Sequence, residues 1–277
     1  MAGAIVNPYS FGGPTYDPTT FPFKHLWWAD GPAFKAKGYA NGGNVTQWPC
    51  EITGLTADQL VPTNTSYADS IPTYSANSGL MNGEPSVTFG TGMHNGMSLP
   101  SLAAFSDAAS MNSGTNPSRG MAAAWRPSTS SVDRVAQSVN SSGADAWAPK
   151  FRSQSSGTWV DIANWYPTPA AAAGRYSSTL AISVMLVDST WLVAGENEAW
   201  FNGVSPGAGA TTSAALGTLP YHSWSLGGTP NSTEAFGGEL SFFGIYTDSS
   251  GNRMKDHADF VDLSDWFSTS YGYELIA

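Results

Sequence analysis

Hydrophobic and polar residues alternate over short stretches along most of the chain, which is typical of β-strands rather than of helices. The clearest stretch is STLAISVMLV at residues 178–187. Leu180, Ile182, Val184 and Leu186 fall on one face of it, and the other face is also largely apolar. We therefore predict a central strand here, buried on both sides.

Shorter stretches follow the same period. Residues 82–92, NGEPSVTFGTG, begin with turn residues and continue with β-branched and aromatic residues, so we predict a turn and a strand with Val87 and Phe89 in the core. Residues 120–126, GMAAAWR, have strand length. Residues 132–166 hold three runs separated by Gly and Ser, which indicates meandering strands.

Near the end of the chain, FGGELSFFGIYTD at residues 236–248 predicts one long strand. Alternation there places Leu240, Phe242 and Tyr246 on one face, and Phe243 and Ile245 on the other.

Only residues 253–271 change period. Phe260, Leu263, Phe267 and Tyr271 lie three or four positions apart, which predicts a helix, and Gly272 is a suitable stop. About a dozen strands with one C-terminal helix and no internal repeat favour an all-β antiparallel sandwich.

Composition agrees with a turn-rich β protein, because only 12% of residues are charged while Gly (30) and Pro (18) are abundant. The formal net charge of −10 disfavours binding to nucleic acid or to an anionic membrane surface. No stretch approaches the roughly 20 apolar residues of a membrane helix, so we expect no membrane insertion. Cys50 is the single cysteine, which excludes an intrachain disulfide, and we expect it to be buried.

Residues 1–24 are aperiodic and rich in Pro and Gly, without the basic and apolar regions of a secretory signal. We interpret them as an N-terminal arm that docks on the domain or on a partner chain, and residues 25–277 as a single domain. The arm carries five aromatic residues, Tyr9, Phe11, Tyr16, Phe21 and Phe23.

Four segments together resemble the laminin-G-like branch of the concanavalin A-like jelly rolls, of the type common in bacteriophage and bacterial proteins. They are HLWWADG to GNVTQW (25–48), NGEPSVTFGTG (82–92), AWFNGV (199–204), and FGGELSFFGIYTD with the later DWFSTSYG (265–272). The resemblance implies a jelly-roll sandwich with a short C-terminal helix.

Gly90 stands where many members of that family carry an aspartate. The sequence also lacks an acidic cluster of the kind calcium requires, so calcium is possible but unsupported. We expect no metal and no other cofactor.

Aromatic residues supply the candidate binding site. Flat aromatic faces beside hydrogen-bonding groups suit sugar rings, although the same residues also suit a core or a protein interface. The candidates for glycan or interface contact are Trp147, Trp159, Trp165 and Tyr166.

Catalysis is disfavoured. The glucanases of the superfamily imply two carboxylates on one strand, and Glu196 and Glu198 are the candidates, but the rest of the Glu-x-Asp-x-Glu pattern is missing. We interpret the two as a solvated strand edge. The four histidines show no metal-binding spacing, and no G-x-S-x-G motif is present.

The function expected from these observations is a non-catalytic bacteriophage virion structural protein, either a minor tail protein or a decoration protein. It would be assembled in the host cytoplasm and displayed on the virion. Its expected partners are other virion proteins, copies of itself and host cell-surface glycans. The alternatives are a free bacterial carbohydrate-binding module and, less favoured, a glycoside hydrolase.

Overall fold

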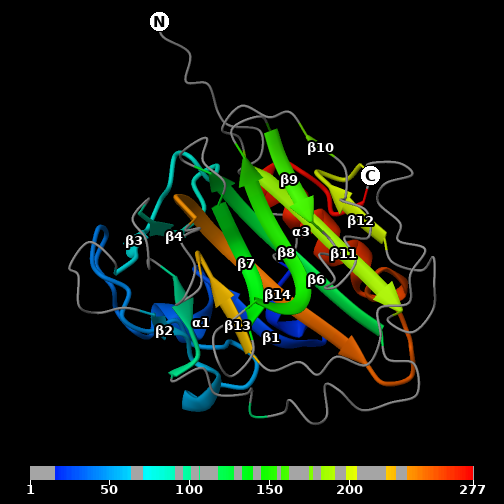
Figure 1. Cartoon of the computed structure of the whole chain (residues 1–277), viewed down its shortest axis with the longest axis horizontal. Helices are drawn as coiled ribbons and strands as arrows, with labels where there is room; N and C mark the ends of the chain where they lie inside the picture. The colour runs from blue at the N-terminus through cyan, green and yellow to red at the C-terminus, as the bar shows by residue number, and fades with distance from the viewer. Residues whose placement is uncertain are drawn as a thin grey trace, which may run out of the picture.

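The computed structural model describes thirteen stretches of the chain. They are residues 16–63, 71–90, 96–100, 106, 118–127, 133–139, 145–154, 157–161, 175–176, 182–190, 198–204, 223–228 and 236–276. Within them the strands form two seven-stranded sheets, and every strand pair is antiparallel (Figure 1). The prediction of an all-β fold is confirmed.

Sheet I has the order β12-β11-β6-β14-β4-β3, and β1 also pairs with β14. Its strands are β1 (Phe23–Trp28), β3 (Thr73–Ser75), β4 (Ser86–Phe89), β6 (Ser118–Pro127), β11 (Ser183–Thr190), β12 (Glu198–Phe201) and β14 (Gly238–Asp248).

Sheet II has the order β10-β9-β8-β7-β13-β5-β2. Its strands are β2 (Val61–Pro62), β5 (Met97–Ser98), β7 (Asp133–Val139), β8 (Asp145–Gln154), β9 (Gly157–Asp161), β10 (Arg175–Tyr176) and β13 (Ser223–Leu226). The helices are α1 (Pro32–Lys35), α3 (Phe260–Tyr271) and three 3₁₀ turns, η2 (Pro18–Thr20), η3 (Thr56–Asp58) and η6 (Met254–Asp256). None of the helices described is long and apolar enough to cross a membrane.

The main core lies between the two sheets. Trp27 and Trp125 of sheet I pack there with Trp224 and Leu226 of sheet II, and all four are fully buried. Val87 and Phe89 of β4 belong to the same core, as predicted from NGEPSVTFGTG. Cys50 is buried there too, and its thiol is free.

A second core lies on the other face of sheet I, where α3 packs (Figure 1). The predicted stripe Phe260, Leu263, Phe267 and Tyr271 is buried against this sheet, and Gly272 ends the helix with a φ of +82°, where glycine is favoured. The C-terminal helix is therefore confirmed, and the molecule has three layers: sheet II, sheet I and α3.

Strand β11 confirms one face of the clearest hydrophobic pattern, and the side chains of its other face lie outside the described residues. Val184 and Leu186 are buried in the second core, and Ile182 packs against it. Leu180 lies outside the described residues.

Strand β14 corrects the predicted alternation. The register against β6 shifts between Leu240 and Phe242, so the strand carries a β-bulge at this point. Leu240 consequently belongs to the core between the sheets, whereas Phe242 belongs to the core beneath α3. The prediction that both residues share a face is wrong, because a bulge reverses the side-chain alternation without leaving a mark in the hydrophobic pattern.

The described part of the N-terminal arm packs on the protein itself. Phe21 and Phe23 are buried in the second core, and Tyr16 packs against it. The Phe21 ring lies 4.8 Å from the Phe23 ring and 6.0 Å from that of Tyr246, measured between centroids. Tyr9 and Phe11 lie outside the described residues.

Candidate functional site

Two of the four predicted aromatic residues lie on neighbouring strands. Trp147 belongs to β8 and Trp159 to β9, and these strands pair in sheet II. Trp165 and Tyr166 lie outside the described residues.

The strand register places Trp159 on a particular face of sheet II. Ala136 of β7 is buried in the core between the sheets, and it pairs with Phe151, which in turn pairs with Val160. Residues directly opposite each other share a face, and the next residue along a strand belongs to the other face. Trp159 therefore has a position on the outer face, away from sheet I.

Helix α3 packs on the face of sheet I that points away from sheet II, so it does not cover the outer face of sheet II. Figure 1 shows β8 and β9 in front of sheet I, with α3 behind it. The register around Trp159 covers Lys150 to Gln154 of β8 and does not reach Trp147. The register thus places position 159 of β9 on the outer face, while the side chains of Trp147 and Trp159 lie outside the described part of the structure.

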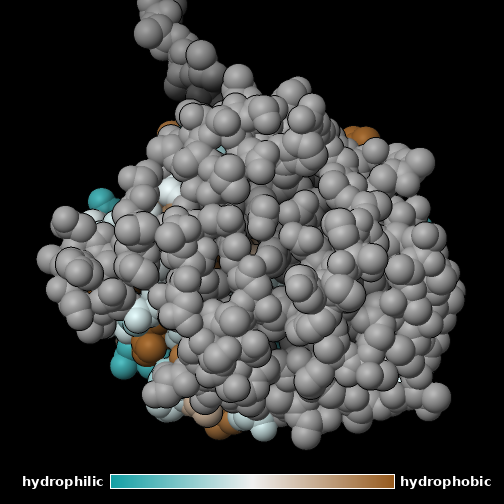
Figure 2. Space-filling model, in the orientation of Figure 1, coloured by the Kyte–Doolittle hydropathy of each residue, from teal (hydrophilic) through white to brown (hydrophobic). Residues whose placement is uncertain are grey.

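Exposed hydrophobic side chains among the described residues do not suggest a second site. The large exposed ones among the described residues are Leu55, Leu80, Val204, Val261 and Tyr273, from five separate segments. Figure 2 shows hydrophilic and hydrophobic residues mixed along the lower left rim, where Figure 1 places α1 and β2. Single exposed hydrophobic residues of this kind are normal for a globular protein.

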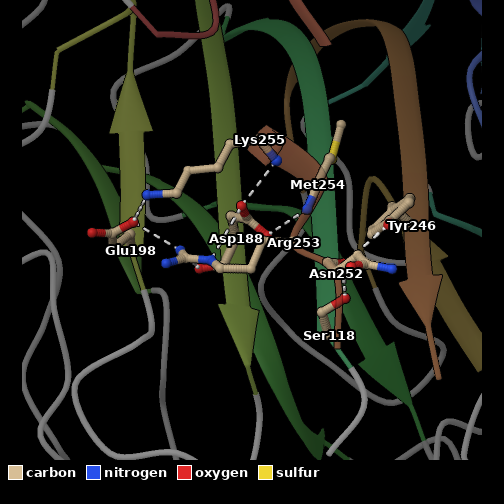
Figure 3. A network of polar contacts seen from close by, with 8 residues as sticks. All are labelled: Ser118, Asp188, Glu198, Tyr246, Asn252, Arg253, Met254 and Lys255. Atoms are coloured by element: carbon tan, nitrogen blue, oxygen red, sulfur yellow. Dashed lines mark hydrogen bonds and ion pairs between the residues drawn. The ribbon is translucent and has the colours of Figure 1, made fainter. Parts of the chain in front are cut away.

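A polar network at one edge of sheet I tests the catalytic hypothesis (Figure 3). Glu198 of β12 lies directly opposite Asp188 of β11. Glu198 Oε2 accepts hydrogen bonds from Arg253 Nη2 at 2.8 Å and from Lys255 Nζ at 2.6 Å. Lys255 also lies over the ring of Trp200, with its Nζ 5.2 Å from the ring centroid.

Asp188 is fully buried in the same network. Its carboxylate accepts hydrogen bonds from the backbone N–H groups of Met254 at 3.1 Å and Lys255 at 3.0 Å, and Arg253 Nε lies 3.5 Å from Oδ2. Because two strands supply the carboxylates and the η6 segment supplies the donors, the network fastens η6 to the sheet edge.

The electrostatics of the two carboxylates differ. Burial raises the pKa of Asp188, and Arg253 only partly offsets this effect. Burial also acts on Glu198, but Lys255 and Arg253 outweigh it and lower the pKa of that carboxyl. Paired carboxylates with separated pKa values can serve acid–base chemistry, yet here cations and backbone donors already occupy both.

The predicted solvated strand edge is therefore only partly right. Strand β12 is the edge strand of sheet I, but Glu198 is half-buried and paired with two cations. Glu196 lies outside the described residues. Sequence reasoning missed Asp188, although a carboxylate that continues the buried face of Val184 and Leu186 is an available signal for a buried, paired charge.

The turn after β14 completes the network in Figure 3. The hydroxyl groups of Ser118 and Tyr246 both donate hydrogen bonds to the backbone carbonyl of Asn252. Burial, assisted by the charge of Asp248, raises the pKa of Tyr246 to about 12, so its hydroxyl remains a donor. These contacts hold the segment from which Arg253 and Lys255 extend.

An exposed serine, Ser106, also meets a buried His and a buried Asp. Asp58 Oδ2 accepts a hydrogen bond from Ser106 Oγ at 2.6 Å, and His25 Nε2 lies 3.8 Å from the same oxygen. Burial alone would raise the pKa of Asp58, but His25 and Ser106 outweigh it and lower that pKa. The serine faces the carboxylate rather than the imidazole, and His25 and Asp58 are fully buried, so this group is structural and not a nucleophile–base pair.

No three His, Cys, Asp or Glu side chains gather as a metal site within the stretches that the structure describes. Gly90, where family members often carry an aspartate, is exposed at the end of β4.

Comparison with known proteins identifies the fold but no family. No protein-family model matches the chain, and no curated protein matches it. Among solved structures, the chain is similar to an arabinofuranosidase complexed with arabinofuranosyl-α-1,2-xylobiose, with a TM-score of 0.55 and 11% identity. That match covers 90% of this chain and 59% of the enzyme.

A second similar structure is the Trypanosoma rangeli sialidase in complex with sialic acid, with a TM-score of 0.52 and 11% identity. The match covers 85% of this chain and 32% of the sialidase, so the chain spans about a third of that enzyme's length. At such identities the similarity concerns the fold.

These comparisons correct the expected function. The prediction of a bacteriophage virion structural protein is wrong, because both of these structurally similar proteins are sugar-cleaving enzymes. The alternative, a carbohydrate-binding module, agrees better with them. The virion location and virion partners expected with the first function are tested by none of these findings.

Proposed function

We propose that this chain is a non-catalytic carbohydrate-binding module, built on a jelly-roll sandwich of the concanavalin A-like type. The observation that carries the proposal is the partial match to the arabinofuranosidase, which covers 90% of this chain but only 59% of the enzyme. The chain thus resembles part of a larger sugar-processing protein, and the two seven-stranded antiparallel sheets suit a jelly roll.

The proposed binding site is the outer face of β8 and β9. Trp159 has a register position there, and Trp147 belongs to the adjoining strand. An indole offers a flat apolar surface on which the C–H face of a sugar ring can stack, while its N–H remains available for a hydrogen bond. A rigid sheet is also a suitable scaffold for such a surface.

The proposal that the chain is non-catalytic rests on the contacts that Glu198 and Asp188 make. A retaining glycosidase needs two carboxylates free to reach the sugar from opposite sides of the scissile bond. Here Arg253 and Lys255 bind Glu198, and Asp188 is buried behind backbone donors. Both carboxylates are therefore assigned to stability rather than to chemistry.

Calorimetric titration with neutral arabinose- and xylose-containing oligosaccharides tests the proposal. We expect saturable binding, and Trp159→Ala should weaken it at least about fivefold, because a stacking contact contributes on the order of 1 kcal/mol. Tyr273→Ala is the matched control, since Tyr273 is an exposed aromatic beyond the end of α3. Circular dichroism would confirm that both variants fold.

Two results would refute the proposal. One is the absence of binding to every saccharide offered. The other is release of reducing sugar by the wild-type protein that Glu198→Gln abolishes, since this would make the network a catalytic site.

A further inference from the structure

Helix α1 and strand β3 form a surface on which half-buried aromatic and charged side chains meet. Phe34 of α1 is buried in the main core, and its ring lies 5.3 Å from that of Tyr74 in β3 and 5.4 Å from that of Tyr39, measured between centroids. Figure 1 shows α1 and β3 on the same side of the molecule. We call this surface the α1 rim, and its members are Asp30, Lys35, Tyr39 and Tyr74.

The two tyrosine hydroxyl groups of the α1 rim have different surroundings. Tyr39 Oη donates a hydrogen bond to the Gln47 carbonyl and accepts one from the Gln47 N–H, both at 2.9 Å. The Tyr74 hydroxyl is open to solvent and makes no hydrogen bond within the described residues. Burial and the charge of Asp30 raise the pKa of Tyr74 while Lys35 acts in the opposite direction, so the hydroxyl lies within electrostatic reach of both charges.

An accessible ion pair stands beside the Tyr74 hydroxyl. Lys35 Nζ lies 2.8 Å from Asp30 Oδ1, and the two side chains are 55% and 28% exposed. An ion pair as accessible as this adds little to stability. Among the described residues, Asp30 Oδ2 and two of the three Lys35 N–H groups have no other partner, so both side chains keep hydrogen-bonding capacity for a ligand.

Hydrogen bonds fix the backbone around the α1 rim. Glu51 accepts them from the N–H groups of Ala33 at 2.7 Å and of Phe34 at 2.9 Å, which holds the start of α1. On the β3 side, the N–H and the carbonyl of Tyr74 both bond to the backbone of residues 42–43, at 2.9 and 2.7 Å. Side chains that stand on a fixed backbone lose less entropy when they bind a ligand.

The charges around the α1 rim disfavour an acidic ligand. Lys35 lies within electrostatic reach of Asp30, Glu51 and Glu84, so one positive charge faces three carboxyl groups. A cationic ligand is also disfavoured, because Asp30 is already paired with Lys35 and Glu51 with backbone N–H groups. Neutral hydroxyl groups suit this surface, since each can donate to Asp30 and accept from Lys35 at the same time.

A saccharide combines adjacent hydroxyl groups with an apolar C–H face that stacks on aromatic rings. We infer that the α1 rim binds a neutral saccharide, whose hydroxyl groups bond to Asp30, Lys35 and the Tyr74 hydroxyl. This inference rests on the proposed carbohydrate-binding function and adds a second sugar site to it, in sheet I. Sequence reasoning missed the site because about 40 positions separate α1 from β3 in the chain.

Calorimetric titration of the full chain tests the inference. The ligands are a neutral xylose oligosaccharide, an oligogalacturonide and an oligosaccharide of glucosamine. Trp159→Ala removes the stacking contact proposed for β8 and β9, and we expect the weaker binding that remains in this variant to come from the α1 rim. The neutral oligosaccharide should bind this variant tightest of the three, with an affinity that added salt leaves unchanged, because salt screens only charged partners.

Two conservative changes in the Trp159→Ala background identify the residues. Asp30→Asn should weaken the remaining binding about tenfold, because hydrogen bonds to a charged group are the stronger ones. Tyr74→Phe should weaken it about threefold, because it removes a neutral hydrogen bond and keeps the ring that packs on Phe34.

The matched controls are Asp265→Asn and Tyr273→Phe, the same substitutions at exposed positions in α3 and just beyond it. Neither should change the affinity. Thermal unfolding midpoints equal to that of the Trp159→Ala parent would show that the losses in Asp30→Asn and Tyr74→Phe concern binding and not folding.

The outcomes separate the inference from the proposed function. Binding that Trp159→Ala abolishes, or that Asp30→Asn and Tyr74→Phe leave unchanged, overturns the inference and leaves the proposed function standing. Tighter binding of the oligogalacturonide or of the glucosamine oligosaccharide to Trp159→Ala overturns the assignment of a neutral ligand. Absence of binding to every saccharide overturns the proposed function and the inference together.

Discussion

Glu84 provides a sharp test of the electrostatics of this fold. Its carboxyl group is half-buried, and burial together with the nearby charge of Asp30 raises its pKa from 4.5 to about 7. A hydrogen bond with Ser270 and the charge of Lys35 act in the opposite direction but do not compensate. The folded protein therefore keeps this carboxyl protonated at pH values where the unfolded chain has lost the proton.

The sign of the effect on stability follows from the raised pKa. A carboxyl with a raised pKa in the folded state contributes stability that is fully present below the unfolded pKa and is lost as the pH rises through the folded pKa. The window is therefore pH 4.5 to about 7. A pKa difference of about 2.5 corresponds to about 3 kcal/mol, and we expect about 2 kcal/mol because the group is partly exposed to screening solvent.

The perturbation is Glu84→Gln, which retains the size of the side chain without the charge. Urea unfolding of wild-type and variant should give similar free energies at about pH 4, and a variant more stable by about 2 kcal/mol at about pH 8. Glu274→Gln, the same substitution at an exposed position, is the matched control. A difference between wild-type and Glu84→Gln that is the same at both pH values would refute the reasoning.

Three further predictions concern stability. Arg253→Ala leaves the buried Asp188 without its cationic partner, so it should lower the free energy of unfolding by about 3 kcal/mol. Urea unfolding measures this, and a loss under about 1 kcal/mol would contradict the role of Arg253. Phe267→Ala should lower the free energy of unfolding by about 3–5 kcal/mol, because it leaves a cavity under α3. Thermal and urea unfolding measure this loss, and an unfolding midpoint equal to that of wild-type would argue against this packing. Gly227→Ala should cost more than about 1 kcal/mol in the same assay, because Gly227 has a φ of +76° and a Cβ there would lie 2.1 Å from the Phe89 ring. Unchanged stability of Gly227→Ala would show that this loop can rearrange.

Much of the fold could be predicted because its determinants are local. The alternation in β11 and the three-to-four spacing in α3 lie within single segments, and a segment carries its own period wherever it packs. The bulge between Leu240 and Phe242 could not be predicted in this way. It depends on how β14 lies against β6, and the hydrophobic pattern is equally consistent with either face because the strand is buried on both.

The candidate sites were harder to predict because they depend on register. Glu198 was visible as a candidate, but its partners Arg253 and Lys255 come from a segment more than 50 positions later in the chain. Trp159 was identified because four aromatic residues lie close together along the chain, interleaved with Lys150, Arg152 and Asp161.

Strand β14 has a consequence for how the chain folds. It pairs with β6 along one edge, and with β4 and β1 along the other, so it is the middle strand of sheet I although it lies near the end of the chain. During synthesis, more than 200 residues are added after β1 before its partner β14 is made. Non-local pairing of this kind slows folding and leaves hydrophobic strand edges exposed meanwhile. The sandwich therefore completes its central sheet only when synthesis has passed residue 248, as a late, chain-wide event rather than a stepwise one.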